Sequence, residues 1–507
     1  MYDEQAPDLI DPDELSEEEL GSSSSRRSCL YLTITLVIIA SLVFSSILTY
    51  FVVTGYETRS ETAVMERVVH VVESGPTAAP ATVVAAAGVA MPTPEPTTIA
   101  PEINRIAIVN ADGQIETMSP TGGDRRVLTS ASDNARFQFP AWSPDGRRLA
   151  LIGNRTLGGA IYVLEDAARS GGLRDHQVYY SVEEAPVYLF WSPDNRNLGF
   201  LANRDRNLLS LNVVATDEAA ESRELATGAP FYWDWSDDGR QLLVHAGHRG
   251  VENMLAMINV DGRIQADNLA VPGDFQAPGI GPGGRYWAFA EADEGLTSLV
   301  VVDTRTGERS SHQQVGSTAL SWIPTGEQIA FTKGFEDGHP FWGPLHVLDA
   351  ATGQEKVLST RTVLAFFWSP DGRQIAFITL GGNFDEDNTI NAGAPAKTAG
   401  VSRVAHEPVA HEPVAQFGRG FLSLSVIDVE SGTGLRLLDF EPTAPFLSVF
   451  LPYFDQYALS HRLWSPDSRA ILLPVREGER DSIQVVSTAG GRPYELAEGS
   501  IAFWSEN

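Results

Sequence analysis

The chain has 507 residues, of which 43% are hydrophobic and 9% aromatic, so it can bury a large core and is not disordered as a whole. Acidic side chains outnumber basic ones by 66 to 36, giving a net charge of -30. This charge excludes nucleic acid as the expected partner, because phosphate contacts need a surplus of Lys and Arg. The single cysteine, Cys29, leaves no intramolecular disulfide and no thiolate set for a structural metal site.

The N-terminal segment is predicted to be a tail followed by a membrane anchor. Residues 1–28 begin with an acidic stretch that has too little apolar surface to fold alone. Residues 29–53 form an uncharged, apolar run. At about 1.5 Å of rise per residue, this run is long enough to cross the hydrocarbon core of about 30 Å as a transmembrane helix. A cleaved signal peptide is the alternative, but its apolar region would be shorter, about 7 to 15 residues.

The orientation and the linker follow from the flanking residues. Arg26 and Arg27 precede the apolar run, which places the acidic tail in the cytoplasm and the C-terminal body outside it. Residues 54–102 are rich in Pro, Ala and Thr, a composition typical of an extended linker. We therefore expect a single-pass protein of the cell membrane, attached to the membrane through Cys29–Val53 and carrying an extracytoplasmic body.

The body, residues 103–507, contains an internal repeat. Its motif of five residues, Trp-Ser-Pro-Asp-Gly in the most regular form, recurs at intervals of 40 to 49 residues, with one interval of 96. Intervals in the forties are typical of the blades of a β-propeller. The first residues of the successive copies are Trp142, Trp191, Trp235, Ile280, Trp322, Trp368, Trp464 and Trp504.

The motif has the composition of a tight turn. Pro presets its own backbone angle, Asp can accept a hydrogen bond from the nearby backbone, and Gly or Asn tolerates the left-handed conformation that closes a hairpin. A short apolar run follows each complete copy, as in Leu149–Ile152 and Ile375–Ile378, and is predicted to be a buried strand. A second turn with Asp and Gly, as at Asp303 to Gly307, adds a second hairpin to most repeats. Two hairpins make a four-stranded blade.

The sequence Trp368 to Phe377 resembles the WD40-like propeller repeat of TolB and of the propeller domains attached to prolyl oligopeptidase-type peptidases. The resemblance extends over residues 103–507. It implies an all-β propeller that acts as an interaction platform, with the motif tryptophans as packing residues between blades. These residues are Trp142, Trp191, Trp235, Trp322, Trp368, Trp464 and Trp504.

The number of blades follows from the ends of the body. Seven copies each begin a full blade, whereas the copy at Trp504 stops within its turn. Arg105–Val109 resembles the strand that follows a motif but has no motif of its own. We therefore predict eight blades, closed by pairing of the C-terminal strand with the N-terminal strands, which removes both sheet edges. Seven blades are the alternative, because the copy at Ile280 is weak. The interval of 96 residues indicates a loop insertion at 381–420.

Candidate binding residues are few, and each has an ordinary structural alternative. The pairs His406, Glu407 and His411, Glu412 offer metal ligands, but Pro408 and Pro413 prevent one helix from presenting them together. Asp385, Asp387 and Thr389 have the spacing of a calcium loop but lack its glycine and distal glutamate. His245 and His248 follow a predicted buried strand and have no third ligand. The aromatic run Phe231–Trp235 could stack a sugar or peptide, but it also suits packing between blades.

These observations favour a binding scaffold over an enzyme. The chain contains no nucleophile elbow, no His-Glu-x-x-His pair and no phosphate loop. We therefore predict no catalytic residue, no metal ligand and no cofactor. The expected function is a membrane-anchored propeller that binds a protein or a cell-envelope component through the loops of one rim. The alternative is a hydrolase or lyase with a metal in the central channel.

Overall fold

The computed structural model describes part of the chain. The described residues are 104–506, apart from 166–172, 206–207, 217–220, 248–253, 268, 274–275, 294–295, 315–317, 335–341, 382–388 and 392–421. The expected tail, transmembrane helix and linker at 1–102 lie outside this set. No helix within it is long and apolar enough to cross a membrane. The chain divides into two units, Met1–Pro96 and Thr97–Asn507, and all described elements belong to the second.

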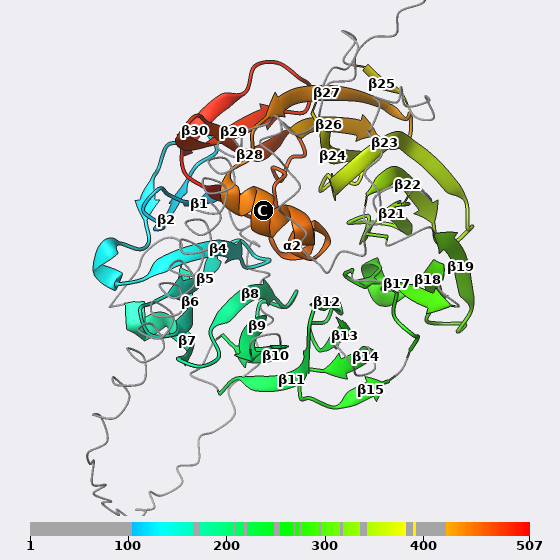
Figure 1. The fold of residues 1–507 in the computed structure, drawn as a ribbon, viewed down its shortest axis with the longest axis horizontal. Helices are drawn as coiled ribbons and strands as arrows, with labels where there is room; N and C mark the ends of the chain where they lie inside the picture. The colour runs from blue at the N-terminus through cyan, green and yellow to red at the C-terminus, as the bar shows by residue number, and fades with distance from the viewer. Residues whose placement is uncertain are drawn as a thin grey trace, which may run out of the picture. The chain divides into compact units, whose positions relative to one another are not determined.

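Antiparallel sheets stand around a common centre and form an all-β propeller (Figure 1). Five sheets have four strands, one has three and one has eight. Four of the four-stranded sheets follow one another along the chain: β4 (Arg136–Trp142), β5 (Arg148–Asn154), β6 (Gly159–Glu165) and β7 (Gln177–Ser181); β8 (Pro186–Trp191), β9 (Asn197–Asp205), β10 (Leu208–Ala215) and β11 (Arg223–Gly228); β12 (Phe231–Trp235), β13 (Gln241–Ala246), β14 (Met254–Asn259) and β15 (Ile264–Ala266); β16 (Gly279–Ile280), β17 (Tyr286–Asp293), β18 (Leu296–Asp303) and β19 (Arg309–Gln314).

The fifth four-stranded sheet joins both ends of the body. Its order is β3-β2-β1-β31, so the C-terminal strand lies beside the N-terminal ones. Ile106 is opposite Trp504 and Val109 is opposite Ile501, as expected from the sequence. The strands of this sheet are β1 (Ile106–Val109), β2 (Ile115–Met118), β3 (Arg126–Val127) and β31 (Ile501–Trp504).

The eight-stranded sheet differs from the expected four-stranded pattern because one long strand serves two neighbours. The first part of β23 (Glu355–Trp368) pairs with β22, and its last residues pair with β24. A three-stranded sheet follows, and an isolated bridge from Trp464 to Ile471 extends it inward. The other strands of these two sheets are β20 (Leu320–Trp322), β21 (Gln328–Thr332), β22 (Gly343–Asp349), β24 (Gln374–Leu380), β25 (Thr389–Asn391), β26 (Leu422–Asp428) and β27 (Thr433–Phe440); and β28 (Ala470–Glu477), β29 (Arg480–Ser487) and β30 (Tyr494–Glu498).

Part of the predicted loop insertion is a strand. Within 381–420, the described residues Thr389–Asn391 form β25 and pair with Thr433–Leu435 of β27. β25 is the edge strand of its sheet and pairs through backbone groups, which a pattern of apolar side chains does not reveal. The repeated segment that contains His406 and His411 lies outside the described residues.

Five of the motif turns are held together by their own Ser and Asp side chains. In the first copy, the Ser143 hydroxyl donates to Asp145 Oδ1 at 2.6 Å, and the backbone N–H of Arg148 donates to Ser143 Oγ at 2.9 Å. Gly146 closes the turn with a φ of 68°. Asn195 and Ser468 adopt the same left-handed conformation in their copies, with φ of 63° and 61°.

Those two residues also link neighbouring turns. Asn195 Oδ1 accepts a hydrogen bond from the backbone N–H of Asp145 at 2.9 Å, and Ser468 Oγ accepts one from Asp371 at 3.1 Å. A glycine at either position would fit the backbone but offer no acceptor. The hydrogen bond to the neighbouring turn therefore explains why these two copies have Asn or Ser where the others have Gly.

Four of the seven motif tryptophans connect adjacent repeats through a hydrogen bond. The indole N–H donates to the carbonyl of the residue that precedes the motif in the neighbouring repeat, at 3.0 to 3.2 Å. The pairs are Trp142 with Phe503, Trp191 with Ala141, Trp368 with Ser321 and Trp464 with Phe367.

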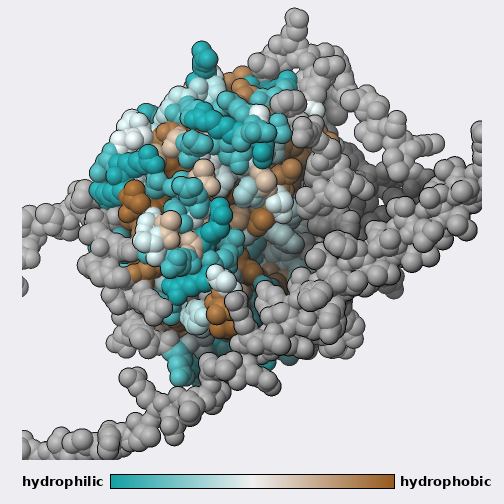
Figure 2. Space-filling view, turned by 60° about the vertical axis from the view of Figure 1, so that its left-hand side comes forward, coloured by the Kyte–Doolittle hydropathy of each residue, from teal (hydrophilic) through white to brown (hydrophobic). Residues whose placement is uncertain are grey.

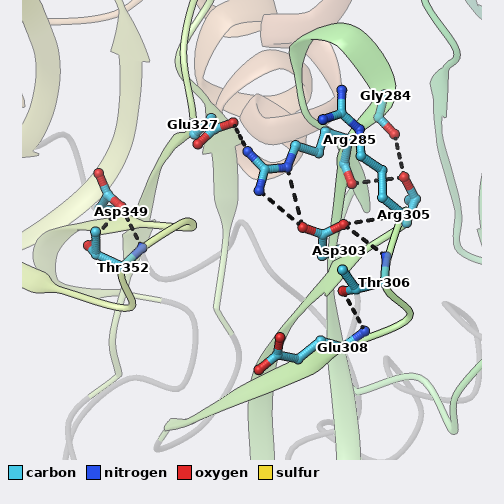
Figure 3. A network of polar contacts seen from close by, with 10 residues as sticks. Gly284, Arg285, Asp303, Arg305, Thr306, Glu308, Glu327, Asp349 and Thr352 are labelled. Carbon is cyan, nitrogen blue, oxygen red and sulfur yellow. Dashed lines mark hydrogen bonds and ion pairs between the residues drawn. The ribbon is translucent and has the colours of Figure 1, made fainter.

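The weak copy at Ile280 forms a sheet in spite of its missing tryptophan. Its turn contains the short helix η3 (Pro282–Gly284), and Arg285 beyond it joins two sheets (Figure 3). The Arg285 guanidinium donates to Asp303 Oδ2 at 3.2 and 3.3 Å and to Glu327 Oε1 of the next repeat at 2.6 Å. An ion-pair bridge thus links the weak copy to its neighbour.

A helical segment at 446–460 occupies the centre of the ring (Figure 1). It consists of the π-helical turn η4 (Phe446–Phe450), the 3-10 turn η5 (Leu451–Tyr453) and the helix α2 (Phe454–Ser460). Phe446, Phe450 and Phe454 are all buried in the main core cluster. The sequence analysis did not predict this segment. We refer to residues 446–460 as the central plug.

The flank of the propeller is mostly polar. Figure 2 shows a largely hydrophilic surface on which apolar residues are scattered among polar ones. Two further 3-10 turns, η1 (Ala131–Asp133) and η2 (Leu173–His176), lie in connections between strands.

Candidate functional site

A cleft of about 340 Å³ lies beside the central plug. Its walls come from the inner strands of four successive repeats and from α2, and include Phe190, Asp234, Trp235, Trp322 and Asp455. Three exposed residues of the motif turns of these repeats also line the cleft: Pro193, Asp237 and Pro324. The cleft therefore opens toward the rim formed by the motif turns.

Asp234 is a buried carboxyl in the wall of the cleft. It lies on β12, where Oδ2 accepts a hydrogen bond from the backbone N–H of Ile280 and Oδ1 accepts one from Trp235, both at 2.8 Å. Burial raises the pKa of Asp234 to about 7, against the lowering effect of these two bonds. Its carboxyl therefore keeps its proton to a higher pH than an exposed aspartate does.

Asp455 is the second buried carboxyl and lies on α2. Its Oδ2 accepts a hydrogen bond from the backbone N–H of Ala277 at 2.8 Å, and Oδ1 accepts one from Gln456 at 3.0 Å. Burial raises the pKa of Asp455 to about 6. The bond from Ala277 ties the plug to the segment that leads into β16, and Asp455 places a carboxyl from the plug in the same cleft as Asp234.

Gln456 attaches the plug to the inner edge of β12. Its side-chain amide accepts from the backbone N–H of Trp233 at 2.8 Å and donates to the Trp233 carbonyl at 2.9 Å. This is the pattern that a neighbouring strand would provide. The side-chain amide of Gln456 also donates to the hydroxyl of Tyr188 at 3.2 Å. That hydroxyl lies 3.0 Å from the backbone carbonyl of Gln456.

A Ser–His pair lies at the end of the plug. Ser460 Oγ is 2.6 Å from His461 Nδ1, and His461 Nε2 is 3.1 Å from the carbonyl of Phe139. Because a carbonyl only accepts, Nε2 carries the proton and Nδ1 accepts from Ser460. Burial lowers the pKa of His461 to about 4, so the imidazole is neutral and a weak base. The arrangement anchors the plug to β4, and its third group is a carbonyl where a catalytic triad has a carboxylate.

Two motif tryptophans beside the cleft depart from the pattern of the others. The indole N–H groups of Trp235 and Trp322 are buried and have no hydrogen-bond partner among the described residues. By position, their acceptors would be the carbonyls of Phe190 and Gly279, both of which line the cleft. Trp504 shares this feature but does not line the cleft.

Close packing explains why the neighbouring repeat has glycine at 279. A Cβ added there would lie 2.6 Å from Cδ1 and 2.8 Å from Nε1 of Trp322, closer than atoms can approach. The indole of Trp322 therefore rests directly on the Gly279 backbone. This contact fixes one wall of the cleft.

The sequence candidates have different outcomes. The aromatic run Phe231–Trp235 is buried throughout as β12, with Trp233 fully inaccessible, so its rings mainly pack the core. His245 is buried on β13, with Nδ1 3.1 Å from the Gln276 carbonyl. Thr389 belongs to β25, and the described residues contain no cluster of three or more metal-ligating side chains. The other candidates lie outside the described residues: His248, Asp385, Asp387, His406, Glu407, His411 and Glu412.

Sequence reasoning missed Asp234 and Asp455. Asp234 stands inside the aromatic run, where the large rings dominated the interpretation. Asp455 belongs to the unpredicted plug. The only available signal was an isolated carboxyl within an apolar stretch, as in Phe231–Trp235, which indicates a buried polar group that must find a partner.

Comparison with known proteins gives matches by structure only. A scan against models of known protein families finds no match, and a search of curated proteins finds none. Among solved structures, TolB from Acinetobacter baumannii matches with 16% identity and a TM-score of 0.32, covering 50% of this chain and 62% of TolB. An oligogalacturonate lyase in complex with manganese matches with 12% identity and a TM-score of 0.39, covering 77% of this chain and 83% of the lyase.

A further match is a puromycin-hydrolyzing peptidase from Mycobacterium tuberculosis. It has 15% identity and a TM-score of 0.41, and the match covers 73% of this chain and 55% of the peptidase. The matches therefore include a lyase and a peptidase beside TolB. At these identities the likeness concerns the fold alone and does not decide between a binding module and an enzyme.

Proposed function

We propose that this chain is a membrane-anchored, eight-bladed propeller that binds a macromolecular partner outside the cytoplasm and catalyses no reaction. Counting the eight-stranded sheet as two blades that share β23 supports eight blades, and the pairing of β31 with β1 supports closure of the ring. The apolar run at 29–53 and the Arg26–Arg27 pair support the anchor and its orientation.

The observation that carries this proposal is the central plug. Its side chains bond to the inner strands or segments of three repeats, at Tyr188, Trp233 and Ala277, and His461 directly after it adds a fourth, at Phe139. A substrate or metal in a propeller channel would need the space that these contacts fill. Among the described residues, a concave surface is present at the cleft beside the plug, which reaches the rim of motif turns where a partner has access.

The alternative is a hydrolase or lyase with a metal in the channel. Metal analysis of the purified full-length protein separates the two functions, because the alternative requires a stoichiometric metal whose removal abolishes turnover. In parallel, the protein is crosslinked in intact cells and its adducts are identified by mass spectrometry. The proposal predicts a reproducible adduct without stoichiometric metal. A bound metal together with turnover of a small substrate would contradict it.

A further inference from the structure

The described part of the cleft wall is acidic. Three carboxyl groups line it, from Asp234, Asp237 and Asp455, and none of the described residues in its wall is Lys, Arg or His. Asp237 is exposed and accepts a hydrogen bond from the backbone N–H of Gly283 at 2.7 Å. The other two are at least nine-tenths buried, with exposed fractions of 9% for Asp234 and 6% for Asp455.

Buried carboxyl groups without a cation are unusual. Folded proteins pair buried charges, because moving an ionised carboxyl out of water is costly without a counter-charge. The hydrogen-bond partners of Asp234 and Asp455 are backbone N–H groups, and among the described residues no basic group is a cause of the pKa shift of either carboxyl. A carboxyl in this position takes up a proton, as the raised pKa of each group reflects, or a cation that arrives from outside.

The two indole N–H groups add a second requirement. Trp235 is 3% exposed, and its N–H and that of Trp322 are buried donors without an acceptor among the described residues. A donor in this state costs free energy until an acceptor reaches it. The cleft therefore offers carboxyl groups that suit a cation and indole N–H groups that suit a carbonyl oxygen.

We propose that the cleft binds a basic side chain, Arg or Lys, of an extended peptide segment of the partner. The cation lies against Asp234 and Asp455, and a peptide carbonyl beside it accepts from Trp235 or Trp322. The aromatic walls contributed by Phe190 and the two tryptophans suit the aliphatic stem and the planar face of a guanidinium. This inference rests on the proposed binding function and names its ligand chemistry. A free amine, which lacks the carbonyl, is the competing ligand.

The test uses the full-length protein labelled with 5-fluorotryptophan and observed by fluorine NMR in detergent. Trp235→Phe and Trp322→Phe assign the two signals. The probe is N-acetylargininamide; its neutral isostere N-acetylcitrullinamide tests the charge, and agmatine, a guanidinium without a peptide carbonyl, tests the carbonyl. We expect N-acetylargininamide to shift the two signals and to bind at least tenfold more tightly than either comparison compound.

Variants place the site. Asp234→Asn and Asp455→Asn each remove one carboxyl and should weaken binding of N-acetylargininamide at least tenfold. Asp112→Asn removes an exposed carboxyl far along the chain in the β1–β2 turn and should leave binding unchanged. Thermal unfolding of each variant identifies any loss of binding that comes from loss of fold, and the wild-type titration stands independently of the variants.

Several results would overturn the inference. One is that N-acetylcitrullinamide or agmatine binds as tightly as N-acetylargininamide. Another is that the signals of Trp235 and Trp322 do not shift at the highest concentration of N-acetylargininamide that dissolves. If crosslinking in cells still identifies a partner, such a result removes the basic-peptide ligand and leaves the binding function intact. Turnover of a small substrate with a bound metal removes the binding function itself.

Discussion

Replacement of Gln456 tests how the central plug is held. Gln456 is 3% exposed, and its amide pairs with both backbone groups of Trp233, which is fully buried. Gln456→Met keeps the length of the side chain but leaves the Trp233 N–H and carbonyl without partners. Each unsatisfied buried group costs about 1 to 3 kcal/mol, so the variant should lose about 2 to 6 kcal/mol of unfolding free energy.

The assay is urea unfolding of the full-length protein, followed by tryptophan fluorescence. Gln313→Met serves as the matched control, because Gln313 is exposed on β19, and it should change the free energy by less than about 0.5 kcal/mol. Gln456→Glu adds a test of direction. Its carboxylate can accept from the Trp233 N–H but opposes the Trp233 carbonyl, whereas the protonated form can donate to that carbonyl.

The glutamate variant should therefore be less stable at pH 8 than at pH 5, relative to the wild type at the same pH. The native state of this variant raises the carboxyl pKa, so its stability falls as the pH rises. If Gln456→Met unfolds within about 1 kcal/mol of the wild type, the amide does not hold the plug to β12, and our account of the filled channel is wrong.

Four further predictions concern the buried carboxyl, the motif turns, the sheet that joins the two ends of the body, and the membrane topology. Burial raises the pKa of Asp234 to about 7, so the contribution of this carboxyl to stability is fully present below about pH 4 and is lost as the pH rises through 7. Relative to Asp234→Asn, the unfolding free energy of the wild type, measured in urea, should therefore fall by about 4 kcal/mol between pH 4 and pH 8. Parallel pH curves for the two proteins would contradict this prediction. Asn195→Ala loses the bond from Asp145 and strains a φ of 63°, so it should cost about 2 kcal/mol in the same assay, whereas Gly307→Ala, with φ of 74° and open space, should cost about 1. Deletion of 501–507 removes β31 from its pairing with β1 and should lower the melting temperature by many degrees; a change of one or two degrees would refute closure of the ring. Protease added to intact cells should digest the body at 103–507 and spare the tail before Arg26, and the reverse pattern would invert the proposed topology.

The turns and strands of the repeat were predictable because their causes are local. Ser143, Asp145 and Gly146 close a turn within five residues, and the apolar run that follows is continuously buried within one strand. The sequence also indicated the pairing partner of Ile501–Trp504, because the motif copy at Trp504 is incomplete and Arg105–Val109 resembles a strand that follows a motif. Periodicity thus indicated the propeller and the joining of its ends.

The plug and the cleft depend on contacts between distant parts of the chain. Asp455 meets Ala277 and Gln456 meets Trp233, and neither pair shares a local pattern. The aromatic residues of the plug, Phe446, Phe450 and Phe454, recur every four positions, but the interval of 96 residues was assigned to the insertion at 381–420. The unpaired indoles are visible only against the bonds that the other motif tryptophans make.

Site-specific photocrosslinking tests the central claim most directly. A photoreactive residue replaces Pro324, which is exposed at the mouth of the cleft, or Gln313, which is exposed on the outer strand β19. The full-length protein is irradiated in intact cells, and the adducts are identified by mass spectrometry. We expect one protein to be captured from position 324 and not from 313, through a peptide that contains Arg or Lys. Capture from 313 alone, or equally from both positions, would contradict a binding site in the cleft.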